Sequence, residues 1–574
     1  MNDYDRRNDG RDRRGDSRDD RRDDRRDDRR DDRRDNRQSS SYGNRDNRRR
    51  DDQPTNNTAR RIRHREISSR SIAYELLNGV DRDDAYANLL LPKLLDDSNL
   101  SSRDSAFAQE LAFGTLRMRG LYDAIIEKCA SRSVGEIDFG ALNLLRLGCH
   151  QLLGMRVPAH AALSETVNQA RAELSLGSVG FVNGVLRRVS EKSREEWLEE
   201  VASSQKDQTE AMAREFSHPA WIVRALGKAL ESDGHGEQLT ELLEADNAAP
   251  LVSLVALPGL ATVDDLLDEG CVMGAASPIG VELPGGEPSD LYLIRSGQAR
   301  VQDQGSQLAA LALIAAADVT PNEEWLDLCA GPGGKAALLA AAAVEVGADL
   351  VCNEISEHRA VLVEKALYKV NPKVYVRVGD GRDLGEEAPE GFDRILLDAP
   401  CSGLGALRRR PEARWRKTAK DVSDLTKLQE ELFDSAWAGL KPGGILAYVT
   451  CSPHLAETTA IIERAQHKVG ADLTVLDAVP ILHQLNPSLK LNAERKTVQL
   501  WPQIHGTDAM FIALLQKANG EGKNPFAIDD ADRTAESEWA PQDELVTAAS
   551  SGAESDSEVK PKRKPRTKSS QTKV

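Results

Sequence analysis

The chain has 574 residues, of which 29% are charged and 40% are hydrophobic, and its formal net charge is −17. This acidic balance argues against nonspecific binding of nucleic acid over the whole surface, although it leaves room for a local basic groove. The sequence contains neither a transmembrane-length apolar run nor an apolar core like that of a signal peptide, which predicts a soluble, cytoplasmic protein with no membrane partner.

Both ends of the chain are predicted to be disordered tails. Residues 1–62 are nearly all Arg, Asp and Asn, and such a segment cannot bury enough apolar surface to offset its conformational entropy. Residues 518–574 are also polar and end in a Lys- and Arg-rich stretch, which either contacts nucleic acid or is simply solvated. Three ordered blocks are expected between the tails.

Residues 63–193 are predicted to form an all-helical bundle. Apolar residues recur at helical spacing in 67–80 and in 181–189, and further helical stretches cover 106–117 and 141–150. Several such helices can share one core. Four arginines of this block are candidates for an RNA-facing surface, and a solvated helix face explains them equally well; they are Arg117, Arg119, Arg187 and Arg188.

The next two blocks are a linker subdomain at 194–301 and a catalytic domain at 302–517. The linker mixes an acidic helical stretch with short apolar runs such as 251–257, which a Pro-Gly turn closes. The catalytic block alternates apolar runs with helical segments, which predicts a parallel sheet with right-handed crossovers. Its strand candidates are 325–328, 350–352, 374–378, 394–397 and 445–449. The predicted fold class is α + α/β.

The ends of these strands carry the chemistry, because open parallel sheets place ligands at the carboxyl ends of their strands. A glycine-rich turn, 329–335, follows the first strand, and its glycines let the backbone approach a ligand at a helix N-terminus. Glu354 follows the second strand and Asp380 the third. Since the phosphate-binding GxxxxGK[ST] spacing is absent, these signals together predict an adenosine-type ligand without a phosphate chain.

Two cysteines also stand at predicted strand ends, Cys401 within 398–405 and Cys451 within 450–453. Such thiols suggest covalent catalysis on an electrophilic carbon, with Asp398 as an acid that could act with them. A buried structural cysteine is the alternative for either position. The seven cysteines of the chain form no CxxC pair, so neither disulfides nor a zinc site are expected.

As a set, these motifs resemble the cytosine-C5 RNA methyltransferases, and among them the Sun/Fmu-type (RsmB/NOP family) 16S ribosomal RNA methyltransferases. The resembling segments are 302–306, 327–335, 380–382, 398–403, 450–452 and 505–511, together with 103–110, 165–167 and 180–188 in the helical block. The resemblance implies a NusB-like RNA-binding domain followed by a Rossmann-like class I methyltransferase domain. It also implies S-adenosyl-L-methionine as co-substrate, no metal, and RNA as partner, with small-subunit ribosomal RNA preferred.

The resemblance further implies a role for each site residue. Cys451 is then the nucleophile that adds to C6 of cytosine, Cys401 assists product release, and Asp398 binds the base. The implied residues of the S-adenosylmethionine site are Cys329, Ala330, Gly331, Pro332, Gly333, Gly334, Lys335, Glu354, Asp380 and Asp398.

Other interpretations stay open at this point. The catalytic motifs alone do not exclude transfer RNA or another RNA as substrate, and a non-catalytic RNA-binding scaffold is possible, although the two intact cysteines speak against it. A DNA cytosine methyltransferase places its nucleophile in a Pro-Cys motif, which is the form of Pro400-Cys401, so the roles of the two thiols could be exchanged.

A basic stretch after Cys401 is predicted to face RNA phosphates. Trp415 lies within it and is expected either to stack on a base or to pack inside the protein. Its cations are Arg408, Arg409, Arg410, Arg414, Arg416 and Lys417.

Overall fold

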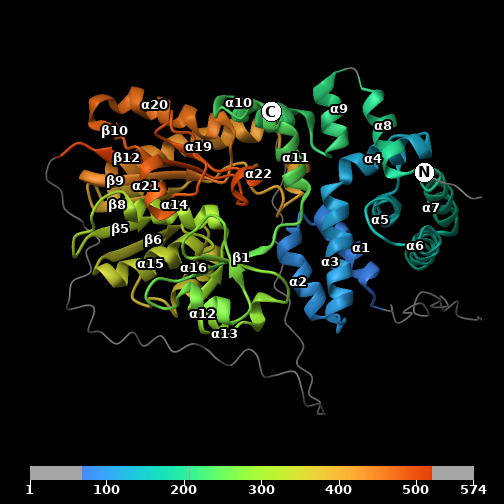
Figure 1. Cartoon of the computed structure of the whole chain (residues 1–574), viewed down its shortest axis with the longest axis horizontal. Helices are drawn as coiled ribbons and strands as arrows, with labels where there is room; N and C mark the ends of the chain where they lie inside the picture. The colour runs from blue at the N-terminus through green and yellow to red at the C-terminus, as the bar shows by residue number, and fades with distance from the viewer. Residues whose placement is uncertain (1–66, 206, 520–574) are drawn as a thin grey trace, which may run out of the picture. The chain divides into compact units, whose positions relative to one another are not determined.

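The computed structural model describes residues 67–205 and 207–519 (Figure 1). The predicted tail at 1–62 lies outside the described residues, and so does the predicted tail at 518–574 beyond Asn519. None of the helices in the described ranges is both long enough and apolar enough to cross a bilayer.

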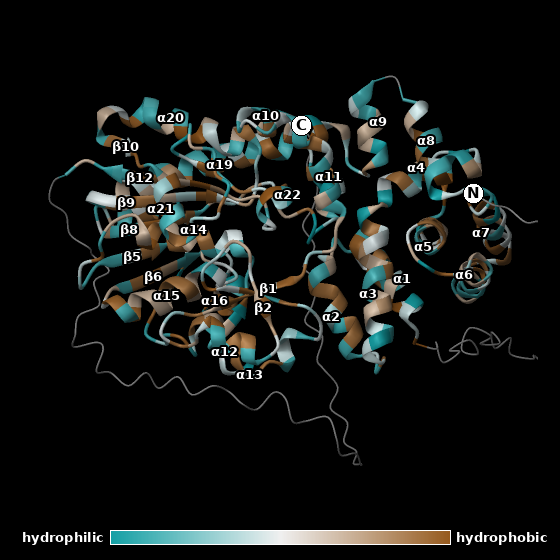
Figure 2. Cartoon of the chain, in the orientation of Figure 1, coloured by the Kyte–Doolittle hydropathy of each residue, from teal (hydrophilic) through white to brown (hydrophobic). Residues whose placement is uncertain are grey.

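The described chain begins with an all-helical part, as predicted. Helix α5 lies at its centre, since twelve of its fifteen residues are buried, and Figure 2 shows this helix as largely hydrophobic. A helix that is apolar on all sides is stable only when other helices surround it. The elements are α1 (Ser69–Arg82), α2 (Ala87–Asp96), α3 (Ser102–Arg117), α4 (Arg119–Ala130), η1 (Val134–Glu136), α5 (Phe139–Leu153), α6 (Ala159–Glu173) and α7 (Leu176–Val189).

Further helices and a small antiparallel sheet follow. The predicted apolar run 251–257 forms strand β1, and the turn after it contains Gly259 at φ +69°, a backbone conformation that favours glycine. The sheet has the strand order β2-β3-β1-β4. The elements are α8 (Arg194–Ser203), α9 (Gln208–Glu215), α10 (Ala220–Ser232), η2 (Gly236–Gln238), α11 (Leu239–Asn247), β1 (Val252–Ala256), α12 (Val263–Asp268), β2 (Val272–Met273), β3 (Gly280–Leu283), η3 (Pro288–Asp290), α13 (Tyr292–Ser296) and β4 (Ala299–Val301).

The remaining part contains an eight-stranded mixed sheet with the order β10-β12-β9-β8-β5-β6-β7, and β11 pairs with β12. The five predicted strands are confirmed as β5 to β9, and every neighbouring pair among them is parallel. Strand β12 runs antiparallel to β9 and to β10. The strands are β5 (Glu324–Asp327), β6 (Asp349–Glu354), β7 (Tyr375–Val378), β8 (Phe392–Asp398), β9 (Leu440–Thr450), β10 (Leu473–Val475), β11 (Val498–Gln499) and β12 (Phe511–Lys517).

Helices cover both faces of this sheet and form a separate hydrophobic core on each. Helices α14, α15 and α21 contribute to one core, and α17, α19 and α20 to the other. The helices are α14 (Gln304–Ala315), α15 (Gly334–Val346), α16 (Glu357–Leu367), α17 (Leu384–Glu387), α18 (Ala413–Arg416), α19 (Ala419–Gly439), η4 (Leu455–Glu457), α20 (Thr459–Val469), η5 (Gly470–Asp472), α21 (Ala478–Leu485) and α22 (Pro502–His505).

The strand order reverses between β5 and β8. Strands β5, β6 and β7 follow one another toward one edge, and β8 then returns to the other side of β5. In open α/β sheets a crevice forms outside the carboxyl ends of the strands at such a point. Asp327 ends β5, Asp398 ends β8 and Thr450 ends β9, so the fold brings the predicted motifs to one place.

Candidate functional site

A cleft of about 510 Å³ lies at the strand ends on either side of this reversal. The turn after β5, the segment after β8 and Cys451 after β9 all contribute to its walls. Residues from much earlier in the chain, Tyr86 and Asn88, also line it. The predicted residues that line the cleft are Cys329, Ala330, Gly331, Pro332, Gly334, Lys335, Asp398, Cys401 and Cys451.

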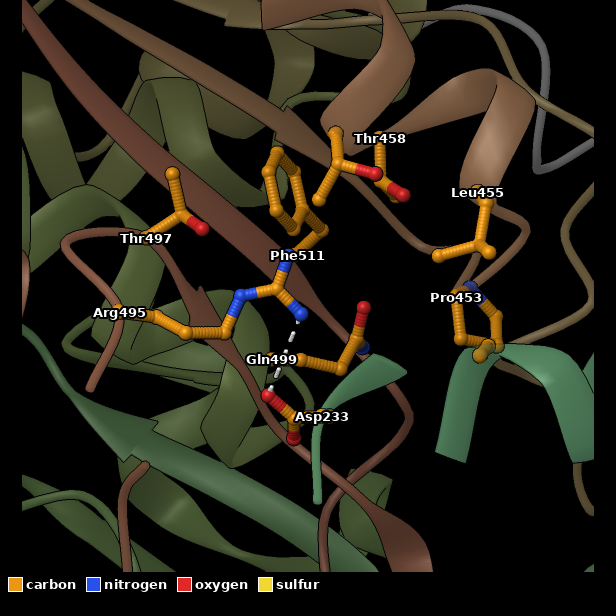
Figure 3. Close-up of a pocket in the computed structure, with 10 residues that line it drawn as sticks. Asp233, Pro453, Leu455, Thr458, Arg495, Thr497, Gln499 and Phe511 are labelled. Atoms are coloured by element: carbon orange, nitrogen blue, oxygen red, sulfur yellow. Dashed lines mark ion pairs between the residues drawn. The ribbon is translucent and has the colours of Figure 1, made fainter. Parts of the chain in front are cut away.

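A second space, drawn in Figure 3, is far smaller. Its volume is about 10 Å³, and Pro453 and Leu455 of the segment after Cys451 form one side of it. Asp233 Oδ1 and Arg495 Nη1 face each other at 3.8 Å within it. Such a volume holds roughly one water molecule and no nucleotide. The large cleft is therefore the candidate site.

Two glycines allow the tight turn between β5 and α15. Gly333 has φ +102°, and a Cβ there would lie 2.6 Å from Cβ of Ala366. A Cβ on Gly331 would lie 2.2 Å from Oε2 of Glu354, which accepts a hydrogen bond from the Gly331 amide at 3.1 Å. The turn is thus held against the end of β6, and it leaves the first-turn amides of α15 without intrahelical partners.

The two predicted thiols are paired. Cys401 Sγ and Cys451 Sγ lie 3.4 Å apart. The hydrogen bond from Cys401 lowers the pKa of Cys451, against burial and the Asp398 charge, and Lys335 and Arg410 lower it further. The same hydrogen bond, together with burial, raises the pKa of Cys401. These opposite shifts favour Cys451 as the thiol that forms a thiolate.

Three charged residues form what we call the catalytic cluster: Asp327, Lys335 and Asp398. Lys335 Nζ donates to Asp398 Oδ2 at 2.8 Å. Burial lowers the pKa of Lys335, but the Asp398 carboxylate outweighs it and the net shift is upward. Asp327 is buried and lines the cleft, and neither of its carboxylate oxygens has a hydrogen-bond partner of good geometry among the described residues, although the nearby Cys329 amide lowers its pKa slightly. Burial and the Asp398 charge raise the pKa of Asp327 to about 7.

Glu354 and Asp380 line a small neighbouring pocket of about 70 Å³, whose other walls are partly apolar. Cys329, Arg359 and Pro400 line both this pocket and the large cleft, so the two spaces adjoin. Glu354 is buried at the end of β6, whereas Asp380 is more exposed and pairs with Arg382 at 2.6 Å. That pairing lowers the pKa of Asp380.

A buried carboxylate ties the two cysteine loops together. Glu457 Oε1 accepts from the Ser402 amide at 2.7 Å, and Oε2 accepts from the hydroxyls of Ser402 and Ser452 at 2.5 and 2.7 Å. Ser402 follows Cys401 and Ser452 follows Cys451 in the sequence. Gln429 adds a donor from α19 at 3.3 Å. Glu457 thus fixes the positions of both thiol-bearing segments.

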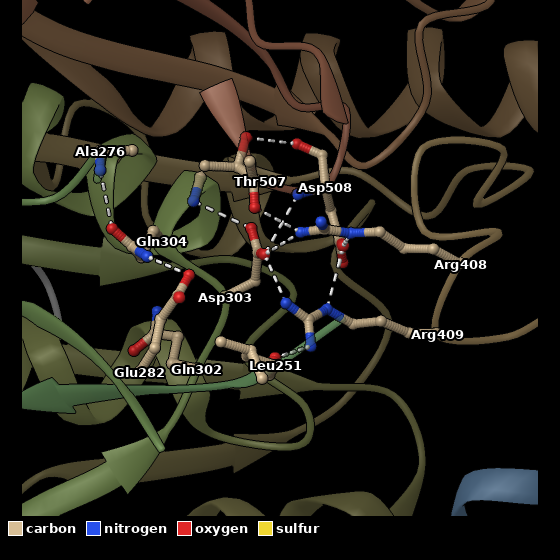
Figure 4. A network of polar contacts seen from close by, with 12 residues as sticks. Leu251, Ala276, Glu282, Gln302, Asp303, Gln304, Arg408, Arg409, Thr507 and Asp508 are labelled. Carbon is tan, nitrogen blue, oxygen red and sulfur yellow. Dashed lines mark hydrogen bonds and ion pairs between the residues drawn. The ribbon is translucent and has the colours of Figure 1, made fainter. Parts of the chain in front are cut away.

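A second group of charges, which we call the clamp, consists of Asp303, Arg408, Arg409 and Asp508 (Figure 4), of which all but Arg408 line the cleft. Asp508 Oδ1 accepts from Arg408 Nε at 2.9 Å and from Arg409 Nε at 3.0 Å. Asp303 Oδ1 accepts from both guanidinium groups and from the Asp508 amide. The clamp joins three segments that are distant in the sequence.

The prediction that the basic stretch 408–417 faces RNA is wrong for Arg408 and Arg414, whose side chains are buried. Arg414 is fully buried and donates to the carbonyl oxygens of Arg117, Ser217 and Asp246. Arg416 donates to the carbonyls of Val80 and Ala85, and the clamp uses Arg408 and Arg409.

Trp415 packs inside the protein, because a Cβ on Gly120 would meet its ring at 2.6 Å. Arg410 and Lys417, the other two cations of the stretch, line the cleft, and so does Arg409 of the clamp.

The four arginines of the helical part that were candidates for RNA contact also differ in their exposure and partners. Arg117 is buried and donates to the Arg408 carbonyl at 3.4 Å, so the prediction of an RNA-facing side chain is wrong for it. Arg119 pairs with Asp81 at 2.9 Å. Arg187 and Arg188 are exposed, and their contact with RNA stays a prediction.

Two functional candidates were missed by reasoning from sequence. Asp327 directly precedes the glycine turn at the end of a strand, which is a signal that could have marked it. Glu457 follows Cys451 by six residues, but nothing local indicates that its side chain turns back to both cysteine loops.

Comparison with known proteins agrees with this geometry. The family model described as 16S rRNA methyltransferase RsmB/F matches residues 314–516, and the NusB family model matches residues 67–191. The putative methyltransferase Rv1407 of Mycobacterium tuberculosis is 47% identical over 454 residues, which cover 78% of this chain and 96% of that protein. The ribosomal RNA small subunit methyltransferase B of Escherichia fergusonii is 36% identical over 393 residues, which cover 67% and 86%.

A solved structure supports the fold. The crystal structure of PH0851 aligns with a TM-score of 0.64 at 21% sequence identity, covering 79% of this chain and 99% of that one. The relatives and the family models together define the family: this chain belongs to the RsmB/F family of 16S rRNA methyltransferases.

Proposed function

We propose that the protein transfers a methyl group from S-adenosyl-L-methionine to C5 of a cytidine in RNA, and that this RNA is small-subunit ribosomal RNA. The observation that carries the proposal is the thiol pair Cys401–Cys451, 3.4 Å apart in a cleft that also holds Asp398. The name of the Escherichia fergusonii relative, a ribosomal RNA small subunit methyltransferase, supports the choice of RNA.

The residues at the strand ends fit S-adenosylmethionine. The small pocket offers Glu354 for the ribose hydroxyls and Asp380 for the adenine amino group, beside apolar walls. Asp327 is a buried carboxylate without a partner, which suits the α-ammonium group, and the first-turn amides of α15 suit the α-carboxylate. Bound there, the co-substrate supplies an electrophilic methyl group.

Cys451 is the proposed nucleophile, because C5 of cytosine is by itself a poor one. The Cys451 thiolate adds to C6, so that an S–C6 bond forms, the C5=C6 π bond breaks and its electron pair moves to C5, which can then take the methyl group. Asp398 accepts a hydrogen bond from the exocyclic amine, and a proton shared between Asp398 and N3 offsets the negative charge that develops on the ring as the thiolate adds; that proton leaves N3 again when Cys451 is released. Lys335 holds the Asp398 carboxylate in place through its 2.8 Å ion pair.

Cys401 acts in the second half of the proposed reaction. Once methylated, C5 still carries its proton, which must leave before the ring regains its double bond. The Cys401 sulfur accepts this proton, after its own has passed to solvent; the C5–H electron pair re-forms C5=C6, the C6–S bond breaks, and Cys451 leaves as a thiolate. The position of Cys401 next to Cys451 supports this role.

We also propose the domain division expected from the sequence. Helices α1 to α7 lie within the NusB-like domain at 63–193, and α8 to β4 lie within the linker subdomain at 194–301. The elements from α14 to β12 lie within the catalytic domain at 302–517. The boundaries can be checked by limited proteolysis of the full-length protein.

A single experiment tests the proposed function. Wild type, Cys451→Ala and Cys401→Ala are incubated with labelled S-adenosylmethionine and either unmethylated small-subunit ribosomal RNA or bulk transfer RNA. Nuclease digestion and mass spectrometry then identify the methylated nucleoside. We expect 5-methylcytidine in ribosomal RNA from wild type, no product from Cys451→Ala, and a covalent protein–RNA adduct that accumulates with Cys401→Ala.

Each other outcome points to a specific alternative. An adduct that depends on Cys401 would exchange the roles of the two thiols. Label found only in transfer RNA would mean that transfer RNA is the substrate. Methylation of a nucleoside other than cytidine would refute the proposed methylation of cytosine C5. If wild type methylates none of the RNAs tested, a non-catalytic RNA-binding scaffold becomes the better description.

A further inference from the structure

The cleft that holds the two thiols is lined in part by the helical region that matches the NusB model. Tyr86 and Asn88 stand at the start of α2, and both line the cleft together with Cys401 and Cys451. Tyr86 is 52% exposed, which is high for an aromatic ring in a folded domain. The proposed catalytic site therefore has a wall that lies outside the residues matched by the methyltransferase model.

Buried polar contacts hold this wall in place. The Ala87 amide, next to Tyr86, donates to Oε1 of the buried Glu412 at 3.2 Å. Arg416 donates to the carbonyls of Val80 and Ala85 at 2.8 and 2.7 Å. Buried hydrogen bonds to charged groups are among the stronger ones in proteins. The backbone around Tyr86 is thus anchored on the segment that follows Cys401, while its ring remains accessible.

The same segment leaves two cations free beside Tyr86. Arg408, Arg409, Arg414 and Arg416 are all used in the internal contacts described above. The side chains of Arg410 and Lys417, by contrast, form no ion pair or hydrogen bond with any residue that the structure describes, and both line the cleft. The guanidinium groups of Arg410 and Arg416 lie 5.9 and 5.5 Å from the centroid of the Tyr86 ring, which still leaves the residue 52% exposed.

An exposed aromatic ring beside unpaired cations is the combination that binds single-stranded nucleic acid, since bases stack on the ring and phosphates pair with the cations. We propose that Tyr86 stacks on a base next to the target cytidine, and that Arg410 and Lys417 bind the adjoining phosphates. This inference rests on the proposed function and adds a specific substrate contact from the NusB-like region. A target base must leave its stack to reach the thiols, and Tyr86 offers its displaced neighbour a new surface.

The test measures methylation kinetics of the full-length enzyme on unmodified 16S ribosomal RNA transcribed in vitro. Tyr86→Ala is expected to raise KM for RNA by about 5- to 150-fold, because stacking on an aromatic side chain contributes about 1–3 kcal/mol per base. Tyr86→Phe keeps the ring and should remain within about twofold of wild type. Tyr292→Ala is the matched control, since Tyr292 is 63% exposed and does not line the cleft.

Two further measurements separate RNA binding from a structural role. The Kd for S-adenosylmethionine, measured by calorimetry without RNA, should be unchanged in Tyr86→Ala. A photoreactive benzoylphenylalanine in place of Tyr86 should crosslink to the RNA, and the same group in place of Tyr292 should not. The crosslink reports proximity even if Tyr86→Ala proves unstable.

Each of these measurements has a result that contradicts the proposal. An unchanged KM for RNA in Tyr86→Ala, equal defects in Tyr86→Ala and Tyr86→Phe, or no crosslink from position 86 would each overturn the proposal. These results require a wild-type enzyme that methylates the RNA, so they cannot be confused with failure of the proposed function, in which wild type itself gives no product.

Discussion

Two groups of charges border the same cleft, and they differ in the number of cations that balance their carboxylates. The clamp has two carboxylates and two guanidinium groups, and each carboxylate is within 3.3 Å of both arginines. The catalytic cluster has two carboxylates and one ammonium group, and Asp327 has no hydrogen-bond partner among the described residues. A buried polar group without a partner costs free energy, so such groups concentrate at functional sites. We therefore expect the balanced group to hold segments together and the unbalanced group to bind a ligand.

The largest expected effect is on the clamp. Asp508→Ala leaves two largely buried guanidinium groups with only Asp303 as an acidic partner, and removal of one side of a buried ion pair costs about 3–5 kcal/mol. Urea unfolding measures this loss. Asp434→Ala is the control, because Asp434 and Lys468 pair on the surface at 44% and 65% exposure and such pairs contribute about 1 kcal/mol or less. Equal losses in the two variants would mean that the clamp does not hold the fold together.

The opposite result is expected in the catalytic cluster. Asp327→Asn keeps the shape of the side chain and removes a buried charge that has no partner, so the unfolding free energy should stay the same or rise. The affinity for S-adenosylmethionine should fall by about 10- to 100-fold, because a charge-assisted hydrogen bond to the α-ammonium group is lost. Calorimetric titration and urea unfolding of the same variant check both statements. A variant that binds normally but is destabilised would make Asp327 a structural residue like Asp508.

Glu457 is intermediate between the two groups, since it is fully buried and satisfied by neutral donors rather than by a cation. Glu457→Gln places an amide where Ser402 and Ser452 donate, which should shift both thiol loops and slow methylation by about tenfold, with unchanged affinity for S-adenosylmethionine. Glu463→Gln, an exposed position on α20, is the control.

The pH dependence of Cys401 alkylation separates an effect of Glu457 on the thiol loops from a loss of stability of the whole protein. The Glu457 charge contributes to the raised pKa of Cys401, after the Cys451 hydrogen bond and burial. In a Cys451→Ser background, Glu457→Gln should therefore move the alkylation profile of Cys401 to lower pH. An unmoved profile with a slower reaction would argue that Glu457 acts on something other than the thiol pair.

The strands and the thiols could be predicted because their signals are local. The predicted run 394–397 forms β8, which has two further residues at its start and Asp398 at its end. Strand β9 begins at Leu440, five residues before the predicted 445, because its pairing with β8 changes register between Phe392 and Arg394. Such an irregularity depends on the neighbouring strand and leaves no pattern in the sequence.

The sequence could not predict which arginines make internal contacts, because their partners are distant in the sequence. Arg408 and Arg414 stand in one basic stretch, yet Arg408 pairs with an acid 100 residues away and Arg414 donates to a carbonyl 297 residues away. Composition predicts a basic surface for both. Only the packing of the helical region against this segment decides that Arg410 stays free and Arg414 does not.

The smallest expected effect is a dependence on pH. Its sign is opposite for the unfolding free energy and for the affinity for S-adenosylmethionine. Burial and the Asp398 charge raise the pKa of Asp327 to about 7, although Lys335 opposes them. Between the ordinary carboxyl pKa and about 7, the folded state retains a proton that the unfolded state has released. Stability therefore falls as pH rises through this window and levels off above it. Asp327→Asn should flatten this slope in urea unfolding.

The affinity for S-adenosylmethionine should instead rise as pH increases toward about 7. Its α-ammonium group prefers the ionised Asp327 carboxylate, so binding below pH 7 must first release the proton, and affinity should weaken by up to about tenfold per pH unit. Affinity should fall again above about pH 8, where a free α-amino group loses its own proton. Calorimetry in buffers of different ionisation enthalpy measures the released proton directly. Asp327→Asn is expected to keep the high-pH limb and lose the low-pH limb, which would assign the low-pH limb to this carboxyl.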